Sequence, residues 1–208
     1  MITVDEIIAR APVIPVITIE KLADALPLCQ ALVSGGLTVL EVTLRTPVAL
    51  QAIRELSEQL PQAIVGAGTV LTEQQAMDAK AAGARFFVSP GSTPAVLSAA
   101  EKAGILLLPG AATPTEMMAL AERGYTLQKF FPAEAAGGVD MLRSLAAPLA
   151  HIRFCPTGGI TPDNANAYLA LPNVVVVGGS WMVSKKLVDG HQWTEIERLS
   201  RLAAALSR

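Results

Sequence analysis

The sequence predicts an α/β fold, a closed (β/α)8 barrel, from three observations. Short runs of β-branched and other apolar residues alternate along the 208-residue chain with longer amphipathic stretches rich in Ala and Leu. Consecutive strands separated by helices run parallel, because each return of the chain crosses over through a helix. Eight such units of roughly twenty to twenty-five residues match a small member of this barrel class. An open doubly wound sheet is the competing architecture.

Eight runs have the length and composition of buried strands. In chain order they are Val13–Thr18, Thr38–Leu44, Ala63–Ala67, Arg85–Val88, Ile105–Leu108, Tyr125–Phe130, Ile152–Cys155 and Val174–Val177. Helical patterns follow these runs at Ile19–Ser34, Pro47–Gln59, Glu73–Ala82, Pro94–Ala103, Pro114–Arg123, Gly138–Ala147 and Pro162–Ala170. Met1–Arg10 and His191–Arg208 are expected as terminal helices added to the barrel, so that residues 1–208 form one domain.

Threonine–proline pairs and glycines mark the expected helix boundaries. Such pairs occur at Thr46-Pro47, Thr93-Pro94, Thr113-Pro114 and Thr161-Pro162. A threonine hydroxyl caps free backbone N–H groups and proline suits the first helical position, so we expect a helix to start at each pair. Glycines expected to cap helix C-termini follow four of the helical stretches, at Gly35, Gly83, Gly104 and Gly124.

Composition excludes several classes of protein. Hydrophobic residues make up 51% of the chain and charged residues 16%, which argues against disorder. The net charge is -2 and no basic run occurs, so we expect no nucleic-acid partner. No apolar stretch has the length of a membrane span, and the N-terminus, with Asp5 and Glu6, does not resemble a signal peptide. Cys29 and Cys155 suit no metal spacing, and we expect them to be reduced core residues of a cytoplasmic protein.

Lys129 lies at the end of an expected strand, within the segment Gly124–Glu134. An unpaired ammonium is costly to desolvate among the apolar residues of a packed sheet. Burial therefore favours the neutral amine, which is a nucleophile toward carbonyl carbons. This position predicts Schiff-base chemistry, although a single lysine here could also reach solvent or pair with an acid.

Polar residues of two strands are expected to point toward the barrel mouth. In the second strand Glu41, Thr43 and Arg45 share one face, and apolar residues occupy the other. Leu127 and Lys129 share a face of the sixth strand in the same way. Barrels of this class carry their chemistry at the carboxyl ends of the strands, so these side chains are candidates for the site. A structural ion pair is the alternative, which we consider weaker because buried pairs contribute little to stability.

Glycine-rich loops follow the last two expected strands. Thr157–Pro162 and Gly178–Ser180 each lead toward a helix, whose N-terminal N–H groups suit an anion. Loops at these two places form the usual phosphate site of the barrel class, although each alone could be only a tight turn. Gly66–Thr69 lacks the third glycine of a dinucleotide fingerprint, so it does not predict NAD binding. Thr69 can still donate a hydrogen bond at the rim.

Metal and cofactor motifs are not found in the sequence. The two histidines, His151 and His191, have no neighbouring ligands at metal spacing. Carbonyl chemistry in this chain therefore depends on the lysine, and we expect neither a metal nor a cofactor. No P-loop and no Gly-x-Ser-x-Gly elbow occurs either.

Five motifs together resemble the family of 2-keto-3-deoxy-6-phosphogluconate (KDPG) and 4-hydroxy-2-oxoglutarate aldolases. They are Glu41–Thr46, Gly66–Val70, Lys129–Glu134, Phe154–Ile160 and Gly178–Trp181. The motifs occur in the same order as in the family and cover nearly the whole chain. The ordered set is far more specific than any one motif.

The resemblance implies a homotrimeric, metal-independent class I aldolase that acts on small molecules and cleaves KDPG to pyruvate and glyceraldehyde 3-phosphate. It also implies activity on 4-hydroxy-2-oxoglutarate. Lys129 matches the Schiff-base residue and Glu41 the acid/base. The remaining matches are Arg45 and Thr69 for the pyruvyl carboxylate, Pro90 and Phe131 for the pocket wall, Thr157 for a substrate contact, and Gly158, Gly159, Gly179 and Ser180 for the phosphate.

Three alternatives stay open at this point. The first is an aldolase specific for the galactonate epimer, or a 4-hydroxy-2-oxoglutarate aldolase with little use for phosphate. Relatives specific for the galactonate epimer tend to carry Asn and Val where this chain has Arg45 and Thr157, so the chain follows the gluconate pattern. A phosphate-binding isomerase or synthase needs no iminium, and Lys129 would then only bind. A non-catalytic sugar-phosphate binding protein would not require Glu41, Arg45 and Lys129 together.

Overall fold

A ring of parallel strands forms the centre of the molecule in the computed structural model, which describes residues 2–207. Two sheets have the strand orders β5-β4-β3-β2-β1-β9 and β6-β7-β8, and every pairing in them is parallel. The strands are β1 (Val13–Ile17), β2 (Val39–Thr43), β3 (Ile64–Gly68), β4 (Phe86–Val88), β5 (Leu106–Leu108), β6 (Gly110–Ala111), β7 (Leu127–Phe130), β8 (Arg153–Pro156) and β9 (Val177–Gly179). The (β/α)8 prediction is confirmed, and the open sheet is not observed.

The two sheets join into one barrel at short interruptions. Pro109 separates β5 from β6, because proline has no N–H to donate, while its carbonyl accepts from the backbone N–H of Lys129 at 2.8 Å. On the other side, Phe154 bridges to Val174 and Thr157 bridges to Gly178. The expected fifth strand is present as β5, one residue shorter than predicted, and β6 is an additional two-residue strand that was not predicted. The expected eighth strand lies later than predicted, at β9.

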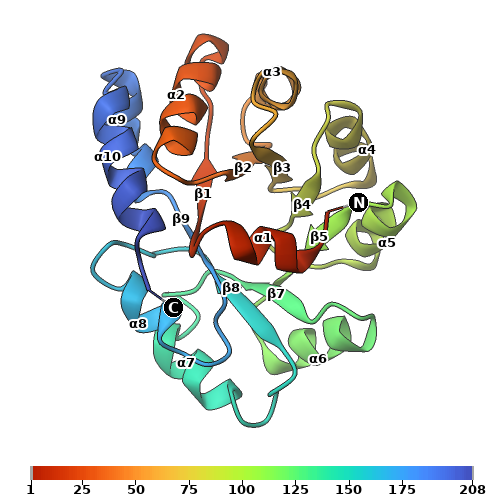
Figure 1. Ribbon diagram of the computed structural model, residues 1–208. Coiled ribbons are helices and arrows are strands. Elements are labelled where there is room, and N and C mark those ends of the chain that lie inside the picture. Colours follow the sequence, from red (N-terminus) through yellow and green to blue (C-terminus); the bar gives the residue numbers. More distant parts are fainter. Residues whose placement is uncertain (1, 208) are drawn as a thin grey trace.

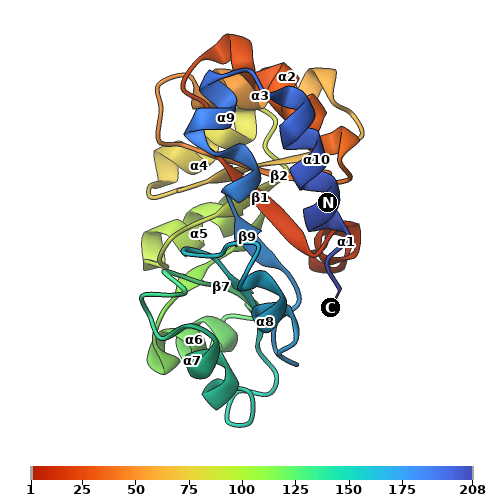
Figure 2. The ribbon, with the colours of Figure 1, turned by 90° about the vertical axis from the view of Figure 1, so that its left-hand side faces the viewer.

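Helices surround this ring on the outside, except the first helix, which lies across one end of the ring (Figures 1 and 2). They are α1 (Val4–Arg10), α2 (Leu22–Ser34), α3 (Ala49–Gln59), α4 (Glu73–Ala81), α5 (Pro94–Ala103), α6 (Pro114–Glu122), α7 (Gly138–Leu145), α8 (Ala165–Leu169), α9 (Lys185–Asp189) and α10 (Trp193–Ala204), with a 3-10 helix at Trp181–Val183. A helix occurs at each predicted place; the ends of the terminal predictions, Met1 and Arg208, lie outside the described residues. Within residues 2–207, no helix is long and apolar enough to cross a membrane.

Two of the four Thr-Pro helix starts are confirmed. Thr93 and Thr113 cap α5 and α6 through their side-chain oxygens, each followed by proline. The prediction at Thr46 is wrong, because α3 starts at Ala49 and the Thr46 hydroxyl donates to the carbonyl of Ile19 at 2.6 Å. The prediction at Thr161 is also wrong, since α8 starts only at Ala165.

Glycines end several helices as expected. Gly104 caps α5 in the left-handed conformation, and Gly83 and Gly124 follow α4 and α6 with φ of 95° and 86°. Gly35 ends α2 in a right-handed conformation, and the left-handed position is taken by Gly36 with φ 95°. Four helix C-termini are thus closed where the sequence placed glycine.

The strands separate two apolar cores. Leu40 and Val42 belong to the larger core, between the strands and the helices. The smaller core fills the barrel interior and includes Val39, Phe86 and Leu127, and its floor is α1, which lies across one end of the barrel and contributes Ile7 (Figure 1). The lower interior is therefore apolar, and polar side chains lie toward the opposite end.

Candidate active site

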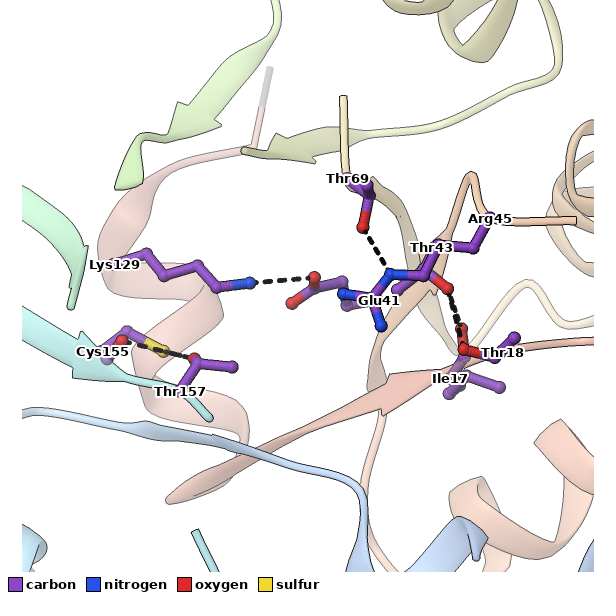
Figure 3. Close-up of polar contacts among 9 residues, drawn as sticks. All are labelled: Ile17, Thr18, Glu41, Thr43, Arg45, Thr69, Lys129, Cys155 and Thr157. Carbon is purple, nitrogen blue, oxygen red and sulfur yellow. Dashed lines mark hydrogen bonds and ion pairs between the residues drawn. The ribbon is translucent and has the colours of Figure 1, made fainter. Parts of the chain in front are cut away.

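Lys129 and Glu41 face each other inside the barrel. Lys129 is the third residue of β7 and Glu41 the third residue of β2, on opposite walls of the ring. Lys129 Nζ lies 3.3 Å from Glu41 Oε1, and their side chains are only 4% and 3% exposed (Figure 3). The sequence predicted that both would point toward the barrel mouth, and the structure places them in contact.

The alternation of each strand explains this placement. In β2, Leu40 and Val42 point outward into the larger core, so Glu41 between them points inward. In β7, Leu127 packs into the inner core, and Lys129 lies one inward position closer to the carboxyl end of the strand. The ion pair therefore lies directly above the apolar floor of the barrel.

Gly68 at the end of β3 provides the space that the Glu41 side chain occupies. A Cβ atom on Gly68 would overlap Glu41 Oε1 and would lie 2.6 Å from Glu41 Cγ and 2.9 Å from Cδ. A Cβ atom in a protein essentially never lies this close to a non-bonded atom, so only glycine leaves room for the carboxylate in this position. This role of Gly68 was not predicted; the available signal was a second glycine directly after the expected strand Ala63–Ala67.

Arg45 and Thr69 lie together at the rim. The Arg45 Nε–H donates to Thr69 Oγ1 at 3.1 Å, and the Arg45 residue is exposed (Figure 3). Thr69 has a φ of 59°, which is rare for a β-branched residue and typical of functional sites. Below Arg45, the Thr43 hydroxyl donates to the Ile17 carbonyl at 3.0 Å, which links β2 to β1.

A pocket of about 120 Å³ opens beside the ion pair. Its wall contains most of the predicted binding residues: Arg45, Phe131, Thr157, Gly158, Gly159, Gly179 and Ser180. The Phe131 ring connects this pocket to the pair, because its centroid lies 5.2 Å from Lys129 Nζ. Pro90 is not part of this wall; it is half-buried after β4 and its backbone packs against Gly110.

The two glycine loops approach each other on one side of this pocket. Gly158 and Gly159 have φ of 98° and 81°, so both need the conformational freedom of glycine. A Cβ on Gly179 would collide with the ring of Trp181, which starts the 3-10 helix. Glycines at these positions allow a bound anion to approach the backbone N–H groups closely.

The helices after these loops are less involved than predicted. After Gly159 the chain makes a turn, and the Asn164 side chain accepts from the N–H of Thr161 at 2.8 Å and donates to the Gly159 carbonyl at 3.0 Å. Helix α8 begins only after Asn164, and a 3-10 helix follows Ser180. The anion donors expected here are therefore the N–H groups of the loops, not those of a long helix.

Thr157 and Cys155 lie next to the Lys129–Glu41 pair (Figure 3). Thr157 is buried, and its side chain fills the space left by Gly178, where a Cβ would lie 3.0 Å from Thr157 Cγ2. Cys155 pairs with Lys129 across the β7–β8 ladder. Burial raises the pKa of the Cys155 thiol to about 12, so this group stays protonated and is not a competing nucleophile. Cys29 is also a free, buried thiol.

Metal ligands are not grouped in the described part of the chain. Among residues 2–207, no cluster of three or more His, Cys, Asp or Glu side chains could hold a metal ion. His191 Nε2 lies 3.2 Å from Asp24 Oδ1, a contact with one carboxylate and not part of a metal-ligand cluster in residues 2–207.

A buried lysine facing a glutamate inside a (β/α)8 barrel is the arrangement expected of a Schiff-base aldolase, a lyase. The chain belongs to the KDPG and KHG aldolase family, whose model matches residues 4–199. The KHG/KDPG aldolase of Escherichia coli K12 is 48% identical over 199 residues, which are 96% of this chain and 93% of that protein. The 2-dehydro-3-deoxy-phosphogluconate aldolase of Zymomonas mobilis is 47% identical over 205 residues, covering 99% and 97%.

Solved structures show the same relationship. The KDPG aldolase of Legionella pneumophila superposes with a TM-score of 0.94 at 48% identity, over 96% of this chain and 97% of that one. In that crystal structure pyruvate was captured as a covalent carbinolamine intermediate. The predicted family is therefore confirmed.

Proposed function

We propose that this enzyme cleaves 2-keto-3-deoxy-6-phosphogluconate into pyruvate and glyceraldehyde 3-phosphate, and that it also acts on 4-hydroxy-2-oxoglutarate. Lys129 is the Schiff-base residue and Glu41 the acid/base. One observation carries this proposal: the Lys129 amine and the Glu41 carboxylate lie 3.3 Å apart, both nearly inaccessible to solvent, beside a pocket lined by two glycine loops. A substrate that extends from this pocket to the pair would meet a nucleophile and a base at once.

The reaction starts with attack of the neutral Lys129 amine on the C2 ketone of the substrate. The resulting carbinolamine loses water and forms an iminium, which accepts electrons from the neighbouring bond. Glu41, through a water molecule, takes the proton of the C4 hydroxyl, and the C3–C4 bond breaks. Glyceraldehyde 3-phosphate leaves, and the enamine that remains is protonated at C3. Hydrolysis of the iminium returns pyruvate and the free lysine.

The residues around the pair are assigned to substrate binding. The Arg45 guanidinium, held by Thr69 at the rim, suits a bidentate grip on the pyruvyl carboxylate. Phe131 and Thr157 contact the carbon chain from the pocket wall. Pro90, outside that wall, is assigned to the carbon chain by the resemblance to the family alone. Gly158, Gly159, Gly179 and Ser180 bind the phosphate, which is remote from the breaking bond and positions it.

We propose further that residues 1–208 form a single domain, because β1 and β9, from the two ends of the chain, pair in one sheet. By its resemblance to the family, the working enzyme is a homotrimer. The cytoplasm is the proposed location, which is consistent with two free, buried thiols.

Borohydride trapping tests the iminium. The protein is incubated with pyruvate and borohydride, and the reduced adduct is located by peptide mass mapping. We expect a pyruvyl adduct on Lys129 and none in a Lys129→Met variant. The matched control is Lys186→Met, which removes an exposed lysine of α9 and should leave the adduct intact. An adduct on another lysine, or none, would refute the assignment and favour an isomerase, a synthase or a binding protein.

Comparison of substrates tests the specificity. We expect cleavage of the gluconate-configured substrate to exceed that of its C4 epimer, the galactonate series. The physical reason is the buried Thr157 hydroxyl, which can distinguish the two orientations of the C4 hydroxyl. Equal rates on both epimers would contradict this part of the proposal.

A further inference from the structure

The loop after β7 is joined to the glycine loop after β8 by backbone hydrogen bonds. Ala133 N–H donates to the Thr157 carbonyl at 2.8 Å, and Glu134 N–H donates to the Gly158 carbonyl at 3.1 Å. The main chain of Glu134 therefore runs alongside the loop that is assigned to phosphate. Its acidic side chain is an unexpected neighbour for such a loop, because a carboxylate repels a phosphate.

The Glu134 side chain packs directly against Gly159. A Cβ on Gly159 would lie 2.5 Å from Glu134 Cγ and 2.7 Å from Glu134 Cβ. Gly159 also has a φ of 81°, so this glycine serves both the turn and the close contact with the glutamate. The two loops therefore touch through side chain as well as backbone, and a shift of Glu134 would shift Gly159.

Tyr168 holds the other end of the Glu134 side chain. Tyr168 lies on α8, is fully buried in the larger core, and its hydroxyl donates to Glu134 Oε1. A Cβ on Gly138, at the start of α7, would lie 3.3 Å from the Tyr168 hydroxyl oxygen, so the pair is packed against a third element. Burial and the hydrogen bond to Glu134 raise the pKa of Tyr168, and the phenol remains a donor at neutral pH.

The glycine loop is thus held from both sides. The Asn164 side chain donates to the Gly159 carbonyl at 3.0 Å on one side, and Glu134, anchored by Tyr168, packs against Gly159 on the other. The backbone N–H groups of this loop converge on a bound phosphate only if the loop keeps a single conformation. A buried anchor on the rigid core supplies that constraint.

We propose that Glu134 and Tyr168 are positioning residues, which hold the Gly158–Gly159 loop in its anion-binding conformation and thereby set the preference for phosphorylated over unphosphorylated substrates. This inference rests on the proposed function of the loop. Neither residue touches the reacting atoms. Their effect is on the phosphate end of the substrate alone.

The test uses Tyr168→Phe in the full-length enzyme. This variant keeps the buried ring and removes only the hydroxyl that anchors Glu134. Loss of a hydrogen bond to a charged group corresponds to about a tenfold change, so KM for KDPG is expected to rise about tenfold. On 4-hydroxy-2-oxoglutarate, which has no phosphate, kcat and KM are expected to stay within about twofold.

Two matched variants sharpen the result. Glu134→Gln keeps an acceptor for the Tyr168 hydroxyl and removes the charge, so its KM for KDPG should stay within about twofold of the wild type or fall. Tyr125→Phe removes the hydroxyl of the other tyrosine in the chain. Tyr125 is half-buried, precedes β7, and has the carboxylate of Glu101 as a neighbour. This variant should leave kcat and KM unchanged on both substrates.

The outcomes are distinguishable. If Tyr168→Phe lost activity equally on both substrates, the role of Tyr168 would be purely structural and the proposal would be overturned. An unchanged KM on both substrates would overturn it as well. Failure of the proposed function itself is a different result, because the wild type would then give no borohydride-trapped pyruvate on Lys129. A phosphate-selective rise in KM with normal trapping supports the inference.

Discussion

Gly68 offers the sharpest test of the active-site geometry, through the substitution Gly68→Ala. Gly68 ends β3, where it pairs with Thr43 and accepts from the N–H of Leu44 at 2.8 Å. The added methyl group would lie 2.6 Å from Glu41 Cγ and 2.9 Å from Glu41 Cδ. Carbon atoms in contact normally lie about 3.5–4.0 Å apart, so the glutamate must retreat by about 1 Å.

That displacement of the Glu41 carboxylate predicts a lower kcat. A misplacement of about 1 Å in a reacting group costs about a hundredfold, which is about 2.7 kcal/mol in the activation barrier. We therefore expect kcat on KDPG to fall about a hundredfold. Overpacking typically lowers the free energy of unfolding by about 1–3 kcal/mol, which leaves most of the variant folded.

Steady-state cleavage rates, corrected for the folded fraction from urea unfolding, measure this effect. The matched control is Gly91→Ala at the rim turn after β4, where a Cβ would meet no atom within 4 Å. It should leave kcat and stability unchanged. If folded Gly68→Ala kept kcat within about threefold of the wild type, Glu41 could not be the base in the position that the structure gives it.

Three further perturbations test the same structure. Glu41→Gln should keep the fold, as judged by circular dichroism, and lose most turnover, because an amide accepts no proton; full activity would refute the acid/base role. Lys129→Met should lower the free energy of urea unfolding by about 3–5 kcal/mol, since it leaves the Glu41 carboxylate buried without a partner, and adding Glu41→Leu should recover most of that loss. Glu116 caps α6, and the backbone N–H of Ala112 holds its pKa below the usual value near 4.5, although partial burial opposes this. The stability that the Glu116 carboxylate contributes is complete above pH 4.5 and is lost as the pH falls through its lower pKa in the folded state. The Tm of Glu116→Gln should therefore fall less steeply with acid than the Tm of the wild type. Identical Tm–pH curves for the two proteins would contradict this.

Periodicity carried most of the fold prediction. Alternation in β2 and β7 was sufficient to point Glu41 and Lys129 inward, because a strand has only two faces. The resemblance of ordered motifs then supplied the family. Boundaries were less accurate where a local signal competed with tertiary contacts. Thr46, for example, resembles a helix cap, but its hydroxyl is used to bind the Ile19 carbonyl of the neighbouring unit.

Contacts between distant segments were not predictable from the pattern. The Lys129–Glu41 contact joins residues 88 positions apart, and only closure of the barrel brings their atoms within 3.3 Å. The roles of Gly68 and Gly159 depend on which side chain fills the missing Cβ position, which no local rule gives. The link between Glu134 and Tyr168 also requires that α8 packs below the loop after β7. Such pairs depend on the register of parallel strands and on helix packing, which a single sequence does not display.

The Lys129–Glu41 pair is badly placed for stability, and this favours a chemical reason for it. Among residues 2–207, Lys129 Nζ has one carboxylate partner, at a long 3.3 Å, above an apolar floor. A buried pair repays its desolvation only when good geometry satisfies every donor, and an ammonium has three. Well-packed apolar side chains would serve the fold as well or better. A lysine that must release a proton and form a covalent bond, in contrast, benefits from being held loosely by a single acceptor that can itself take up protons. The weakness of this ion pair is therefore what the proposed Schiff-base role of Lys129 would require of it.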